Sequence, residues 1–138
     1  MEHLSDEILR LCREYGECRV DAERREEARD VANALESVCV EAGQRLDISD
    51  PALLLALLDA CEVTRDEGML QEVLDVVGRN LDRLAVSAES VKLLACCYYY
   101  VEEEECVERA GRMLEELRKM GRGEEELADV ETILEELT

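Results

Sequence analysis

Apolar residues recur every three or four positions along this chain, and no alternating apolar–polar run extends beyond a few residues. This spacing collects the apolar side chains on one face of an α-helix, whereas a half-buried strand would alternate. The single proline, Pro51, lies where a helix is expected to begin. The pattern predicts an all-α protein.

The residues at the ends of the periodic segments divide the chain into seven predicted helices. They span about 5–15, 21–42, 51–63, 65–84, 88–101, 102–120 and 124–137. Four of these helices begin at or directly after an N-cap residue: Ser5, Asp21, Asp50 and Ser87. Thr64 and Glu67 match a capping box before the fourth helix. Gly16 and Gly43 are expected to end the first and second helices.

Two segments are apolar around almost the whole helix, Pro51–Val63 and Val91–Val101. Only a central position, covered by neighbours on several faces, removes all of these side chains from water. We therefore expect them to be the two most buried segments of the fold.

The helix boundary near Glu102 is open to two interpretations. A turn there would place Glu102–Glu105 at a helix N-terminus, where acidic side chains are favourable. The alternative is one long helix from Ala88 to Met120, in a compact multi-helix bundle. The turn is the preferred interpretation, because a helix of about 33 residues is unusual in a chain of this size.

An offset of 36 residues aligns the two central pairs of predicted helices. Under it Leu55, Leu58 and Cys61 fall on Val91, Leu94 and Cys97. This stretch of about 70 residues resembles tetratricopeptide-like helical-hairpin repeats, although the strict repeat pattern is not met. The seven predicted helices pair as three stacked helical hairpins plus a C-terminal capping helix, and the chain length favours a single domain over residues 1–138.

The charge balance narrows the classes of partner. The 138 residues include 36 acidic and 16 basic side chains, for a formal net charge of -20. Nucleic-acid binders and basic membrane-surface helices need clustered Lys and Arg, so neither partner is expected. No apolar stretch reaches the ~20 residues of a membrane span, and the acidic start does not match a secretory signal. We expect a monomer that is cytoplasmic or a soluble recombinant product, and not secreted.

Few residues have the pattern of a chemical site. The only histidine is His3, and the seven cysteines include no CxxC pair. Cys12, Cys39, Cys61 and Cys106 lie in phase with the apolar stripes, as core residues would. Adjacent Cys96 and Cys97 would make a strained redox pair, and helix packing is the preferred role. We expect no enzyme, cofactor, metal or small-molecule substrate.

Three consecutive tyrosines, Tyr98, Tyr99 and Tyr100, are the one aromatic cluster. On a helix they spread over about 300°, so the three rings cannot share one face. They either fill the core with their hydroxyls at the surface or line a peptide-binding groove.

Three features occur together in this sequence: regular helix caps, acid-before-base pairs at i,i+4 spacing such as Glu105–Arg109, and a lack of Phe and Trp. In these features the chain resembles a computationally designed all-α protein, which implies a structural scaffold with no natural activity. Seven cysteines and the mid-helix Gly78 and Gly111 are atypical of designs. The alternative is a natural acidic helical-repeat adaptor that binds a protein or peptide partner on a helical groove.

Overall fold

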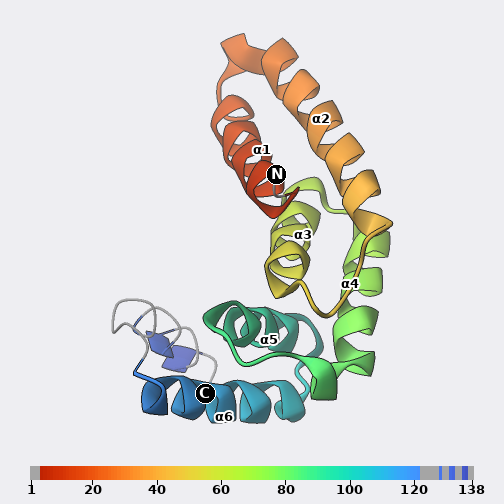
Figure 1. Ribbon diagram of the computed structural model, residues 1–138. Coiled ribbons are helices and arrows are strands. Elements are labelled where there is room, and N and C mark those ends of the chain that lie inside the picture. The colour runs from red at the N-terminus through yellow and green to blue at the C-terminus, as the bar shows by residue number, and fades with distance from the viewer. Residues whose placement is uncertain (1–3, 122–127, 129–130, 133–134, 137–138) are drawn as a thin grey trace. The chain divides into compact units, whose positions relative to one another are not determined.

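The computed structural model describes residues 4–121, 128, 131–132 and 135–136. Within these residues every regular element is helical, so the all-α prediction is confirmed (Figure 1). The elements are α1 (Leu4–Cys18), η1 (Ala22–Arg24), α2 (Arg25–Gly43), α3 (Pro51–Thr64), α4 (Glu67–Arg79), η2 (Leu81–Arg83), α5 (Ala88–Val101) and α6 (Glu104–Lys119), where η marks a short 3-10 helix. No helix of the described part combines the length and apolar character needed to cross a membrane.

Packing divides the chain into two compact units, Met1–Val76 and Val77–Thr138. The boundary falls inside α4, so one continuous helix contributes to both units. The expectation of a single domain concerns whether the units unfold together, and it stays a prediction.

In the first unit, α1 packs against both α2 and α3. Figure 1 shows α1 and α2 running antiparallel beside one another. The largest fully buried side chains of this unit come from all three helices and from α4: Ile8, Leu35, Leu54, Leu57, Leu58 and Val73. Burial of each such side chain stabilises the fold by about 1.5–3 kcal/mol relative to leaving it exposed.

The prediction that Gly16 ends the first helix is wrong. α1 continues to Cys18, and the amide of Arg19 still donates to the carbonyl oxygen of Tyr15 at 2.9 Å. Cys18 is completely buried, and this packing offsets the cost of about 1 kcal/mol for glycine inside a helix.

The helix start at Pro51 is confirmed, since the Asp50 carboxylate accepts from the amide of Leu53 at 3.2 Å. The capping box before α4 is wrong. Thr64 remains in α3, where its hydroxyl donates to the carbonyl of Ala60, and Asp66 caps α4 by accepting from the amide of Met69. The fourth helix also ends earlier than expected, at Arg79 instead of Leu84.

The expected hairpin arrangement is not confirmed. α3 makes its main contacts with α1 and α2, and α4 is not among its principal neighbours. A helix that is apolar on all sides can pack against any neighbouring helix of complementary shape. The sequence therefore did not determine which helices cover it.

In the second unit, α5 and α6 pack side by side, and the turn between them confirms the predicted break near Glu102. The alternative of one helix from Ala88 to Met120 is wrong. Glu102 adopts a left-handed conformation with φ of 53°, and its amide donates to the carbonyl of Tyr98 at 2.8 Å. The Ser87 cap is also confirmed, by a 3.1 Å hydrogen bond from the amide of Ser90.

α3 and α5 bury the most residues of the described helices, as the sequence predicts. The predicted capping helix over 124–137 falls largely outside the described residues, so the count of seven helices is not confirmed. Of that segment, Glu131 pairs with Arg118 at the end of α6.

Candidate functional site

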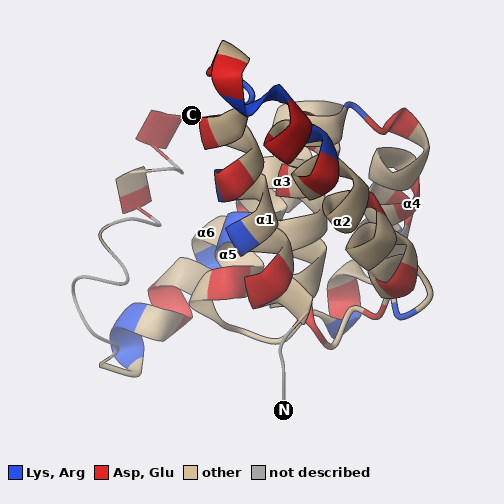
Figure 2. Cartoon of the chain, turned by 90° about the horizontal axis from the view of Figure 1, so that it is seen from above, with Lys and Arg blue, Asp and Glu red and all other residues tan. Residues whose placement is uncertain are grey.

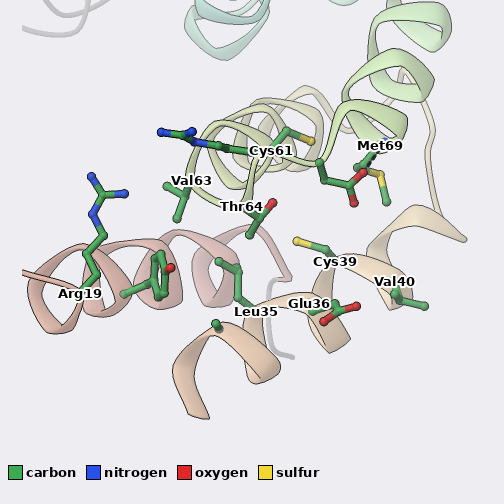
Figure 3. A pocket seen from close by; sticks show the side chains of 13 residues that line it. Arg19, Leu35, Glu36, Cys39, Val40, Cys61, Val63, Thr64 and Met69 are labelled. Carbon is green, nitrogen blue, oxygen red and sulfur yellow. Dashed lines mark hydrogen bonds between the residues drawn. The ribbon is translucent and has the colours of Figure 1, made fainter. Parts of the chain in front are cut away.

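A groove of about 710 Å³ opens in the first unit, where the end of α1, the middle of α2, the end of α3 and the start of α4 meet (Figure 3). Its volume lies in the range typical of ligand sites, about 300–1,000 Å³. It is lined by Tyr15, Arg19, Ala32, Leu35, Glu36, Cys39, Val40, Cys61, Val63, Thr64, Arg65, Asp66 and Met69.

The apolar floor follows from helical spacing. Ala32, Leu35 and Cys39 are three and four positions apart on α2, and such residues share one helix face. Leu35 is fully buried, whereas Val40 at the margin is 57% exposed. Along α2 the lining side chains therefore change from buried to exposed, and apolar surface remains accessible to a ligand.

The polar rim contains two kinds of side chain. Thr64 and Asp66 are engaged locally, in the hydrogen bonds that end α3 and begin α4. Arg19, Glu36 and Arg65 are exposed, and no other described residue forms an ion pair or side-chain hydrogen bond with them. Elsewhere in this unit, Arg10 and Arg24 have carboxylate partners on nearby turns. The groove thus retains unpaired charge of both signs.

These charges are separated along the groove. In Figure 3, Arg19 lies at one end near Val63, and Val40 and Met69 lie at the other, with Glu36 toward the Val40 end. Arg65 follows Thr64 and takes the left-handed conformation that ends α3, with φ of 59°.

The groove also contains two thiols, and neither is poised for chemistry. Burial raises the pKa of Cys39 to about 11 and, with the Asp66 carboxylate nearby, that of Cys61 to about 12. Burial also raises the pKa of the neighbouring Cys12 to about 11, with Asp59 contributing. A thiol is nucleophilic as its thiolate, so these side chains act as apolar lining at neutral pH. Within the described residues, no group of His, Cys, Asp and Glu gathers to hold a metal ion.

The three consecutive tyrosines lie in the second unit and do not line this groove. Tyr99 is 70% exposed, and Tyr98 and Tyr100 are half-buried. The rings of Tyr99 and Tyr100 pack edge to face with centroids 5.2 Å apart. The tyrosine groove stays a prediction.

Sequence reasoning missed the groove in the first unit. Its residues come from four segments between Tyr15 and Met69, and their meeting depends on how each helix is rotated. One signal was available: Val40 is an apolar residue outside the buried stripe of the second helix.

Comparisons with protein families, with curated proteins and with solved structures gave no match to this chain.

Proposed function

We propose that this chain is a helical adaptor whose groove in the first unit binds a short segment of a partner protein. The observation that carries the proposal is the groove itself, which joins an apolar floor around Leu35 and Cys39 to an unpaired charged rim. Apolar surface supplies affinity in such sites, and a few placed polar groups supply orientation.

The lining favours binding over catalysis. Its titratable groups are two arginines, two carboxylates, two thiols and the phenol of Tyr15. The thiols are held protonated by burial, and the Asp66 carboxylate is engaged in capping α4. A nucleophile with a base beside it, which covalent catalysis requires, does not arise from this set.

A designed scaffold with no ligand is the competing proposal. It is favoured by the well-formed caps at Asp50, Asp66 and Ser87, which serve stability alone. The stacked helical-hairpin arrangement belongs with either proposal as an expectation of the sequence. The two proposals differ in whether the groove has an occupant, and this difference can be measured.

The test is selection of random peptides on the immobilised full chain, followed by affinity measurements on two matched variants. Val40→Glu places a charge in the groove margin, and Val20→Glu makes the same change at an exposed position outside the lining. Both valines are well exposed, at 57% and 79%, so neither change should unfold the protein.

We expect selected peptides that bind the wild type and Val20→Glu alike and bind Val40→Glu at least about tenfold more weakly, about 1.4 kcal/mol. If no peptide is enriched, or if both variants bind equally well, the adaptor proposal is wrong and the scaffold proposal is favoured.

A further inference from the structure

The walls of the groove limit the kind of peptide backbone that fits. All of its lining residues belong to helices or lie directly beyond a helix end, at Arg19 after α1 and at Arg65 and Asp66 after α3. Helix walls have their backbone groups already bonded, so they offer no strand edge to an extended peptide. A helical segment satisfies its own backbone groups and needs only an apolar stripe toward the floor.

The rim then limits the charge of that segment. Within the described part of the chain, Arg19 at one end of the groove and Glu36 toward the other have no charged partner, and neither has Arg65, which follows the last residue of α3. A carboxylate of the ligand is favoured near Arg19, and a basic side chain is favoured near Glu36. Arginine suits carboxylates in particular, because its planar donors can bond both oxygens.

The charge of the whole chain adds a second constraint. At a net charge of -20, acidic segments are repelled during approach, and Figure 2 shows the acids spread along the helices. A segment with at least as many bases as acids avoids this repulsion and can still present one carboxylate to Arg19. At physiological salt the long-range repulsion is screened beyond about 8 Å, whereas direct pairing in the groove is screened less.

We propose that the groove binds a mixed-charge amphipathic helix in one orientation, with a carboxylate against Arg19, a basic side chain against Glu36 and an apolar stripe on the floor. This inference rests on the proposed adaptor function and deepens it. Orientation is set by the separation of charge along the rim, and the floor accepts aliphatic side chains in either direction.

The test uses two synthetic helical peptides of about 15 residues with the same leucine stripe. The mixed peptide has Glu near one end of the stripe and Lys near the other, and the basic peptide has Lys at both ends. Each is titrated by fluorescence anisotropy against the wild type, Arg19→Glu, and the control Arg25→Glu. Arg25 is an exposed arginine at the start of α2 that does not line the groove.

Arg19→Glu should fold normally, since Arg19 is exposed and lies just beyond the last residue of α1. Circular dichroism of each variant checks this.

We expect the wild type and Arg25→Glu to prefer the mixed peptide, and Arg19→Glu to prefer the basic one, with a change in preference of about tenfold. Equal effects of the two substitutions would overturn the inference, because only overall charge would then matter. Binding of selected peptides but of neither synthetic helix would overturn it and leave the adaptor function standing. If no peptide, selected or synthetic, binds in a way that Val40→Glu weakens, both this inference and the adaptor function are overturned.

Discussion

Six of the seven thiols have a raised pKa, and burial is the main cause in each. They are Cys12, Cys18, Cys39, Cys61, Cys97 and Cys106. Their common origin is the position of these cysteines in or beside apolar helix faces, which the sequence predicts for four of them. The side chain therefore serves packing, and its reactivity is suppressed by the same packing.

Thiol labelling tests this at residue scale. At pH 8 a thiol with a pKa of about 11 is roughly 0.1% thiolate, against roughly a tenth for the ordinary value of 9.0. We expect Cys12 and Cys39 in the native protein to react with a disulfide reagent about 100-fold more slowly than in the denatured chain. Mass spectrometry of the labelled peptides identifies each site, and rapid native labelling of either thiol would contradict the prediction.

Asp59 gives a second prediction at this scale. Burial, with Glu62 nearby, raises the pKa of its carboxyl group above 3.8. Because the folded pKa is above the unfolded one, the ionised carboxylate costs stability above the folded pKa, and the cost disappears below the unfolded value. Asp59→Asn should therefore raise the free energy of unfolding at pH 7 and have little effect near pH 3. Denaturant titrations at the two pH values measure this, and destabilisation at pH 7 would contradict it.

At the scale of the helix, the sequence correctly predicts a helix end where a single capping side chain determines it. The prediction fails where tertiary packing favours a different end. Asp50 and Ser87 cap as expected, because each accepts a hydrogen bond within its own turn. Gly16 does not end α1, because burial of Cys18 two residues later outweighs a local preference. The groove was not predictable for a related reason, since it depends on the relative rotation of four helices.

Two helices end on a residue in the left-handed conformation that is not glycine, Arg65 and Glu102. A side chain there costs about 1 kcal/mol relative to glycine, which adopts this conformation freely. Glu102→Gly should therefore raise the free energy of unfolding by about 1 kcal/mol in denaturant titrations. The adjacent Glu103→Gly, where φ is -81°, is the matched control and should bring no gain. A destabilised Glu102→Gly variant would contradict the assignment of strain.

For the whole molecule, the strongest long-range interaction is the electrostatic repulsion among the excess acidic side chains. The described ion pairs include exposed pairs between residues three or four positions apart, such as Arg10–Glu14 and Arg45–Glu41, and each of these contributes a few tenths of a kcal/mol. Self-repulsion at a net charge of -20 should exceed them.

Raising sodium chloride from low salt to several hundred millimolar should therefore raise the melting temperature. A gain of about 1 kcal/mol corresponds to about 4 °C for a chain of this size. A single transition at both salt concentrations is expected if the two units unfold as one domain. A melting temperature that falls with salt would show that the ion pairs outweigh the repulsion.

Amide chemical-shift mapping shows whether a partner segment binds in the groove of the first unit. The labelled full chain is titrated with a display-selected peptide. We predict the largest shifts at Leu35, Cys39, Val40 and Val63, with little change at Tyr98–Tyr100. Shifts confined to the tyrosines would place the site in the second unit instead, and no shifts at saturating peptide would contradict the adaptor function altogether.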